Sequence, residues 1–268
     1  MRKIDPLQMT NETQVVLYAV KGAIATLTLN RPEKRNALNE AIIEQLKSSL
    51  RKANDDTSIK AIIITGAGKD FCSGADLSAL QKISHSSVSE NAEDARSLLE
   101  LFTLIRAVTV PVIAAVRGRA LAGGCGLASA CDLVLASADA RFGYPEVKIG
   151  FVPAMVTAIL RRNVSEKRAF ELLTCGLEID AQTGQKFGLV NQVFADDSFD
   201  VEVSAYASQF EELSRSAVGL TKTLLYQIDG LAFDEAVAAG ADTNVIARLT
   251  EDCRVEIDRF LGKKSDSS

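Results

Sequence analysis

The hydrophobic positions near the start of the chain alternate with polar ones. This alternation runs through Val15–Val20 and Ala23–Leu29, separated by Lys21-Gly22, and it predicts two strands joined as a β-hairpin. Asn39 then stands directly before a stretch with helical spacing, so we expect it to cap a helix. The apolar face of that helix is expected to comprise Ile42, Ile43, Leu46 and Leu50.

Three later segments are almost continuously apolar, namely Ile59–Thr65, Val110–Val116 and Leu133–Ala136. A strand covered on both faces shows this pattern, so these segments predict the centre of a mostly parallel sheet. Between the first two, a polar, serine-rich stretch at residues 78–94 predicts a loop. An amphipathic helix after that loop is marked by Leu98, Leu101, Phe102 and Ile105.

The pattern turns helical at Ala154 and is almost wholly helical from Ala195 to Leu261, with breaks near Ser214 and Gly230. Strands alternating with helices, followed by helices alone, indicate the α/β class. We therefore expect a core at residues 1–197, in which a β-β-α unit recurs loosely, and a helical region at residues 198–268.

Composition and charge narrow the class of protein. A chain of 268 residues that is 47% hydrophobic and 24% charged is typical of a globular protein. The net charge of −5 argues against a general nucleic-acid surface. Five cysteines without a CxxC pair favour reduced thiols. The polar N-terminus and the absence of an apolar run of about 20 residues predict no membrane contact and a cytoplasmic protein.

Particular residues argue against several common nucleotide-binding and catalytic motifs. The sequence GAGKD at residues 66–70 lacks the remaining P-loop residues, and Phe71 stands where GxGxxG requires its third glycine. The single histidine, His85, lies in the polar stretch and is expected to be solvated, which leaves serine or cysteine hydrolysis without a usual base. No cluster of residues shows metal-ligand spacing.

Two glycine-rich turns, FCSGAD and LAGGCG, each follow an apolar strand. Glycine lets a backbone N–H approach a ligand closely, and a helix that begins at Gly123 would offer N–H groups without intrahelical partners. Two such turns side by side would form an oxyanion hole for a thioester carbonyl that becomes an enolate. The alternative on spacing alone is two tight turns without a ligand.

Glu146 supplies a candidate for proton transfer. It follows Pro145 and lies among apolar neighbours in FGYPEVKIG, where burial would raise its pKa toward the working range of a general acid or base. A solvated turn residue or a helix-start carboxylate is the alternative.

Four motifs in order carry a family resemblance: LNRPEKRNALN, FCSGADL, ALAGGCGLASACDLVLAS and FGYPEVKIGFVP. At these separations they closely resemble the crotonase superfamily, the enoyl-CoA hydratase/isomerase family, over residues 15–261. The resemblance implies a spiral of ββα units with a C-terminal helical trimerisation region. It also implies homotrimers or dimers of trimers that act on acyl-CoA thioesters with no metal or redox cofactor, coenzyme A being part of the substrate.

The resemblance also assigns residues by position. The backbone N–H groups of Ala75 and Gly123 would form the oxyanion hole, and Glu146 matches a catalytic glutamate. The coenzyme A site would be lined by Lys34, Arg35, Ala37, Asp76 and Leu77, with Phe260 and Lys263 closing it from the terminal helix. Further substrate contacts are expected from Gly124, Gly126 and Pro145.

Gly126 departs from the hydratases that use two glutamates, because the first of these stands three positions after the oxyanion-hole glycine. We expect its missing side chain to leave room for acyl chain or water. Hydratases of the methylglutaconyl-CoA type resemble this chain in having glycine here and in a Pro-Ala like Pro153-Ala154. A 2-enoyl-CoA hydratase is therefore the first interpretation. A 3-enoyl-CoA to 2-enoyl-CoA isomerase that uses Glu146 alone is the second, and a non-catalytic acyl-CoA binding protein is the third.

Overall fold

The first two strands form the predicted hairpin. The computed structural model describes residues 14–76, 81 and 85–265, and in it β1 (Val16–Lys21) pairs antiparallel with β2 (Ile24–Leu29). Gly22 in the connecting turn has a φ of 58°, a left-handed conformation that favours glycine. Alternation along the sequence therefore predicted both the strands and their pairing.

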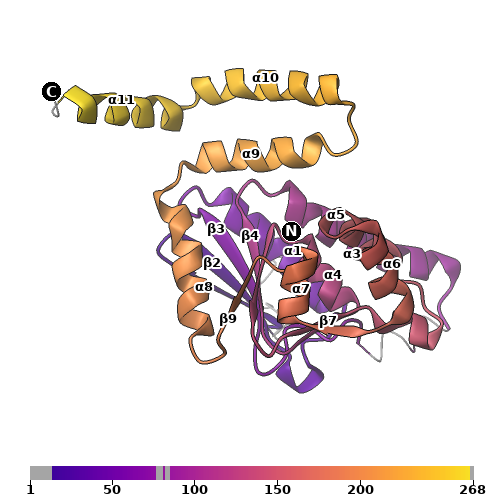
Figure 1. Cartoon of the computed structure of the whole chain (residues 1–268). Helices are drawn as coiled ribbons and strands as arrows, with labels where there is room; N and C mark the ends of the chain where they lie inside the picture. The colour runs from indigo at the N-terminus through magenta and orange to yellow at the C-terminus, as the bar shows by residue number, and fades with distance from the viewer. Residues whose placement is uncertain (1–13, 77–80, 82–84, 266–268) are drawn as a thin grey trace, which may run out of the picture.

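The larger sheet has six strands in the order β1-β2-β3-β4-β6-β9 (Figure 1). Its other members are β3 (Ala61–Gly66), β4 (Val112–Val116), β6 (Leu133–Ser137) and β9 (Gln192–Phe194). Every pair from β2 to β9 is parallel, which confirms the expected mostly parallel sheet. The sequence pattern missed β9, which is an edge strand of three residues inside a region that was expected to be helical.

A second, three-stranded sheet consists of β5 (Arg119–Leu121), β7 (Arg141–Gly143) and β8 (Glu178–Asp180). None of these strands was predicted, since three residues are too few to show alternation. Two of them, β5 and β7, complete the recurring unit, because β1-β2-α1, β4-β5-α4 and β6-β7-α5 occur in this order along the chain. The expected spiral of ββα units is confirmed.

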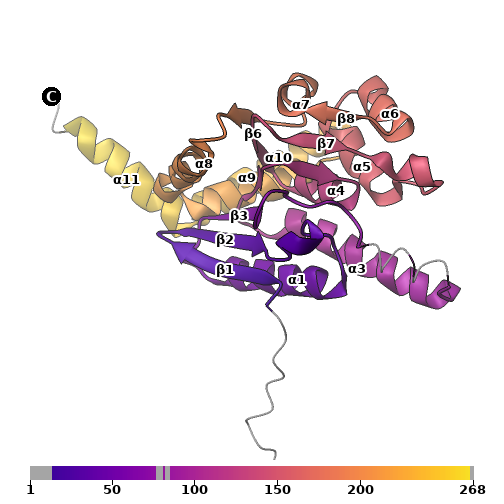
Figure 2. The ribbon, with the colours of Figure 1, turned by 90° about the horizontal axis from the view of Figure 1, so that it is seen from below.

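Helices cover both faces of the larger sheet. Helices α1 (Glu40–Asp55) and α3 (Val88–Ala107) lie on one face, and α8 (Phe199–Ser208) lies on the other (Figure 2). Ile62 of β3 belongs to the core cluster that includes Leu46 of α1. Ile63, the next residue of the strand, belongs to a second cluster with Phe199 of α8. The boundary near residue 197 stays a prediction.

The two helices on the first face differ in how well they were predicted. Asn39 caps α1 as expected, and its side chain accepts a hydrogen bond of 3.0 Å from the Ile42 N–H. Helix α3 begins at Val88, inside the stretch that was expected to be a loop. Ser87 and Glu90 form a reciprocal capping box, which stabilises this polar first turn without apolar contacts.

The remaining helices occupy the second half of the chain: α5 (Ala154–Asn163), α6 (Glu166–Cys175), α7 (Ala181–Phe187), α9 (Arg215–Gln227), α10 (Phe233–Leu249) and α11 (Glu251–Ser265). Both expected breaks are present, because Ser214 caps α9 and Gly230 has a φ of 98°. Helices α9 to α11 lie beyond one end of the sheet, and α11 leads away from the body (Figure 1). Within the described residues no helix combines the length and apolar character needed to cross a membrane.

A buried ion pair attaches α9 to the rest of the molecule. The Nζ of Lys222 lies 2.7 Å from the Asp132 carboxylate and donates to the carbonyls of Ile105 and Val110. The hydroxyl of Tyr226, one turn farther along α9, donates to the same carboxylate at 2.6 Å. Burial lowers the pKa of Lys222, and Asp132 opposes that shift. This site therefore joins α9 to the turn between α4 (Gly123–Ala130) and β6.

Candidate active site

The two glycine-rich turns meet where α4 begins. The Leu121 N–H donates to the Cys72 carbonyl at 3.0 Å, which ties β5 to the first turn. Gly74 has a φ of 94°, and a Cβ at this position would lie 2.8 Å from the Ala122 Cβ. The same Cβ would lie 3.6 Å from the Gly123 nitrogen. A side chain at Gly74 would therefore push the turns apart.

Each turn carries a backbone donor that the fold does not use. Around Ala75, the Leu38 N–H donates to the Gly74 carbonyl at 2.7 Å and the Asp76 N–H donates to the Leu38 carbonyl at 3.0 Å. The N–H of Ala75 and that of Gly123 have no acceptor among the residues that the structure describes. Gly123 is the first residue of α4, as predicted, where an N–H has no intrahelical partner.

The glycines inside α4 serve packing. A Cβ at Gly124 would lie 2.2 Å from the Cys72 carbonyl oxygen, so glycine lets the helix rest on the first turn. A Cβ at Gly126 would lie 2.3 Å from the Val156 Cγ1 and 3.3 Å from the Phe102 ring. The room expected beside Gly126 is therefore absent, because Val156 of α5 occupies it. The spacing along one helix could not reveal a neighbour 30 residues away.

Glu146 lies in the short 3-10 helix η2 (Pro145–Ile149), which follows β7. Its side chain is half-buried, and its Oε2 atom is buried without a hydrogen-bond partner among the described residues. Burial raises the pKa of this carboxyl, and its own backbone N–H partly opposes the shift. Burial is the main cause that raises the pKa of the Cys125 thiol in α4, and the charge of Glu146 adds to it, so the carboxylate lies near α4. The expected direction of the pKa shift is confirmed.

The loop before α1 is held by Arg31 and Asn36, which the motif reading did not single out. Arg31 pairs with Asp76 at 2.8 Å and donates to the Ala37 carbonyl at 3.0 Å. Asn36 is fully buried with a φ of 54°, and its amide donates to the Asp70 carbonyl at 2.7 Å. The sequence pattern that could have indicated Arg31 and Asn36 is a cationic and an amide side chain in a loop next to buried strands.

The residues expected to line the coenzyme A site divide by exposure. Lys34 and Arg35 are exposed, whereas Ala37 and Asp76 are buried. The ion pair with Arg31 gives Asp76 a part in holding the turn. Leu77 lies outside the described residues, and Pro145 is half-buried next to Glu146.

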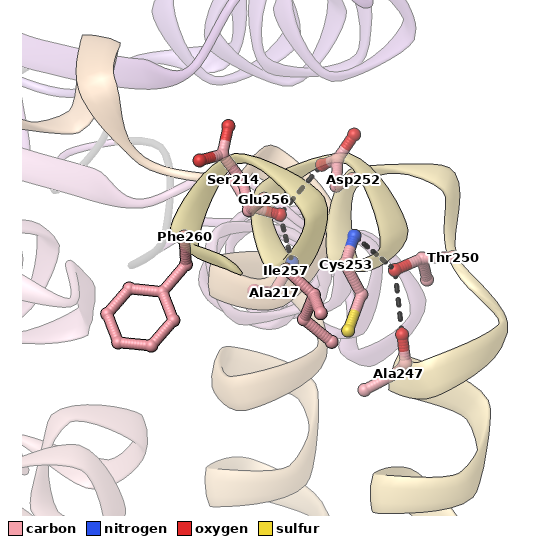
Figure 3. Close-up of a pocket in the computed structure, with 9 residues that line it drawn as sticks. All are labelled: Ser214, Ala217, Ala247, Thr250, Asp252, Cys253, Glu256, Ile257 and Phe260. Atoms are coloured by element: carbon pink, nitrogen blue, oxygen red, sulfur yellow. Dashed lines mark hydrogen bonds between the residues drawn. The ribbon is translucent and has the colours of Figure 1, made fainter. Parts of the chain in front are cut away.

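Phe260 lies in a different place from the other candidates. It is 63% exposed and lines a groove of about 310 Å³ between α9, α10 and α11 (Figure 3). Helix α11 lies at the opposite end of the molecule from α5 and α6, which follow Glu146 (Figure 1). The side chain of Lys263 lies outside the described part of the chain. A role for these two residues at the coenzyme A site stays a prediction.

Comparisons with known proteins agree with this arrangement. The family model described as "Enoyl-CoA hydratase/isomerase" matches residues 19–265. The chain is 37% identical to the 2,3-dehydroadipyl-CoA hydratase of Escherichia coli over 90% of this chain and 93% of that protein. It is 35% identical to the crotonyl-CoA hydratase of Syntrophomonas wolfei over 93% and 95% of the two chains. The crystal structure of an enoyl-CoA hydratase from Mycobacterium smegmatis superimposes with a TM-score of 0.88, at 32% identity over 93% of this chain and 96% of that one.

Proposed function

The chain belongs to the enoyl-CoA hydratase/isomerase family, and from this premise we propose that it hydrates a 2-enoyl-CoA thioester with Glu146 as general acid/base. The observation that carries the proposal combines two N–H donors without an acceptor among the described residues, at abutting turns, with a half-buried carboxylate whose Oε2 atom has no hydrogen-bond partner among those residues. Unused backbone donors stabilise an oxygen that gains charge, and a carboxyl with a raised pKa both takes up and returns a proton.

The proposed reaction moves one proton through Glu146. Its carboxylate takes a proton from water while the water oxygen bonds to C3 of the substrate. The electron pair of the C2=C3 bond moves toward the thioester carbonyl, and the N–H groups of Ala75 and Gly123 hold the resulting enolate oxygen. The enolate then returns its pair to C2, which takes the proton from Glu146. The step needs no redox cofactor, because water supplies both the hydroxyl group that adds to C3 and the proton that reaches C2, and the substrate undergoes no net oxidation or reduction.

One observation favours a second reaction. Val156 fills the space beside Gly126, so a single carboxylate has to act without a second one at that place. Isomerisation of a 3-enoyl-CoA needs a proton to leave C2 and arrive at C4, which one carboxylate can do alone. We keep this isomerase activity as the second candidate.

A direct assay separates the candidates. Purified protein is offered crotonyl-CoA and, separately, a 3-enoyl-CoA, while the ultraviolet absorbance of the conjugated thioester is followed. Loss of absorbance from the first supports the hydratase, and a gain from the second without change in the first supports the isomerase. Tight binding measured by calorimetry without turnover of either would leave an acyl-CoA binding protein.

Replacement of Glu146 tests its role in either reaction. Glu146→Gln is expected to lower kcat by about 10²- to 10⁴-fold, because the amide cannot carry the proton. Glu178→Gln is a matched control, since this carboxylate lies on β8 in an ion pair with Arg119. Unchanged turnover in Glu146→Gln would remove Glu146 from the mechanism.

We also propose that the enzyme assembles as a homotrimer or dimer of trimers through the C-terminal helices. Helix α10 has no buried residue, and Phe233, Val245 and Leu249 on it are 81%, 58% and 64% exposed. Exposed apolar side chains gathered on neighbouring helices are typical of a surface that another chain covers. The five cysteines are all free, which supports a reducing, cytoplasmic location.

A further inference from the structure

Tyr144 makes a buried contact with α4. Its side chain is fully buried, and it stands directly before η2, two residues from Glu146. Its hydroxyl lies 3.0 Å from the Ser129 Oγ, and that Oγ donates to the Cys125 carbonyl at 2.7 Å. A carbonyl can only accept, so the single Ser129 proton goes to Cys125 and Tyr144 must donate to Ser129.

This relay of two hydroxyl groups joins the segments that carry the proposed reacting groups. Ser129 and Cys125 belong to α4, the helix that begins at Gly123, whose N–H has no acceptor among the residues that the structure describes. Tyr144 begins the turn that carries Glu146. Both segments are already close at the backbone, because the Ala122 N–H donates to the Gly143 carbonyl at 2.8 Å. The link from Tyr144 to Ser129 continues this attachment one residue nearer to Glu146.

The carboxylate of Glu146 depends on such a link. Its Oε2 atom has no hydrogen-bond partner among the described residues, so this oxygen is positioned by the backbone of η2. Burial is the main reason why the pKa of the Cys125 thiol is raised to about 11, and the Tyr144 hydroxyl is close enough to that thiol to oppose part of the rise. The phenol therefore contacts two residues of α4 at one point.

Packing alone does not explain the hydroxyl groups. Phenylalanine at position 144 would fill nearly the same volume, and alanine at 129 would place no polar atom in the core. A buried hydroxyl is unfavourable unless it forms hydrogen bonds, and here both hydroxyls form them. The bonds have a direction, which apolar contacts lack, and they fix how η2 is oriented on α4.

We propose that Tyr144 and Ser129 are positioning residues, whose buried relay sets Glu146 at its working distance from the Gly123 N–H. The inference rests on the proposed function, because it assigns a purpose to the geometry of that same site. Neither residue is expected to touch the substrate, and both act through Glu146.

The test uses Tyr144→Phe, Ser129→Ala and the double variant, assayed with crotonyl-CoA, or with the 3-enoyl-CoA if the protein proves to be an isomerase. Each single variant is expected to lower kcat by about threefold to tenfold, as the loss of one hydrogen bond does. KM is expected to stay within about twofold, because ground-state binding is untouched. The double variant is expected to be no slower than the slower single variant, since both changes break one relay.

The pH profile separates positioning from stability. A loosened η2 exposes Glu146 to more water, so its raised pKa falls, and the acid limb of kcat/KM moves to lower pH in Tyr144→Phe. Tyr226→Phe is the control, because it removes a hydroxyl bonded to Asp132 at 2.6 Å, far along the chain from Glu146. It is expected to lower the melting temperature and leave kcat and the acid limb unchanged.

Two outcomes would overturn the relay. One is a set of variants that melt at lower temperature yet keep wild-type kcat and acid limb. The other is a double variant whose loss equals the product of the single losses. If Glu146→Gln is inactive in the same experiments, only the relay fails, whereas an active Glu146→Gln removes the proposed function itself.

Discussion

The sheet core and the C-terminal helices differ in how far they bury their apolar side chains. In α1, Ile42, Leu46 and Leu50 are all 0% exposed, and they pack on the sheet. In α10, no residue is buried, and Phe233 is 81% exposed. The core therefore completes its own packing within one chain, whereas the apolar side chains of α10 stay exposed in the single chain, where we propose that another copy covers them. We propose that the first region carries the chemistry and that the second carries association.

Gly74→Ala tests the core side of this comparison and has the largest expected effect. The added Cβ meets Ala122 at 2.8 Å in a left-handed backbone, so the two turns must separate and one N–H leaves its place. We expect kcat to fall by about 10²-fold or more, as when one oxyanion donor is lost. Gly240→Ala in α10, where a Cβ meets nothing within 4 Å, is the control and is expected to keep kcat. Normal steady-state turnover in Gly74→Ala would show that the contact between the turns is not needed.

Charged substitutions on α10 test whether the C-terminal helices carry the association between chains. Phe233→Asp combined with Leu249→Asp places two carboxylates on surface that we expect to be covered, where charge is strongly disfavoured. The molar mass from light scattering is expected to fall to that of one chain, with unchanged far-ultraviolet circular dichroism. Phe170→Asp is the matched control, since Phe170 is 69% exposed on α6 of the core. A double variant that keeps its mass would place association elsewhere.

Lys222→Met tests the buried ion pair that attaches α9 to the sheet core. It leaves the buried Asp132 without its cation, and breaking a buried pair in this way costs about 3–5 kcal/mol. We expect a loss near the lower end, because Tyr226 and the Val112 N–H still bond to Asp132. Urea unfolding measures it, with Lys186→Met on the exposed face of α7 as the control. A loss no larger than in the control would mean that α9 is held by other contacts.

Gly126 and Val156 test packing within the core. Gly126→Ala gains helix propensity, yet its Cβ meets Val156 at 2.3 Å, so we expect a net loss of about 1–2 kcal/mol from overpacking. Val156→Ala removes the obstructing methyl group and leaves a cavity when made alone. The double variant is expected to be more stable than the two single losses predict, by about 1 kcal/mol or more. Simple additivity in the unfolding free energies would rule out the contact.

The smallest expected effect is a dependence of stability on pH. The pKa of Glu146 is raised in the folded protein, so the folded state binds this proton more tightly than the unfolded state does. The associated stability is present below the ordinary carboxyl pKa and is lost as pH rises through the folded value. Glu146→Gln should therefore melt higher than wild type at pH 8, by at most about 3 °C, and the gap should close toward pH 4. An equal gap at both pH values would contradict a buried, ionised Glu146.

Features with a local cause could be predicted from the sequence. Asn39 capped its helix and Gly123 began another, because caps and helix starts depend on a few neighbouring residues. The start of α3 could also have been predicted, since Ser87 and Glu90 have capping-box spacing. The polar composition of this stretch predicted a loop instead.

Features set by distant partners could not be predicted. The three-residue strand β7 exists because it pairs with β5 and β8, and nothing in its own three residues requires a strand. The Val156 methyl group beside Gly126 and the Ser129 hydroxyl beside Tyr144 likewise join elements that only the fold brings together. The candidate reacting groups were therefore found from motifs, while the residues that surround them had to come from the structure.

Helix α4 is held at both ends, and the Lys222–Asp132 ion pair provides one of the two contacts. At its first turn, Gly124 packs against Cys72. Just past its last residue, Asp132 forms the ion pair with Lys222 of α9. A force that lifts α9, α10 and α11 from the body would thus act directly on the helix whose opposite tip offers the Gly123 N–H. One of the two contacts that hold α4 thus comes from α9, in the region that we propose to bind other copies of the chain.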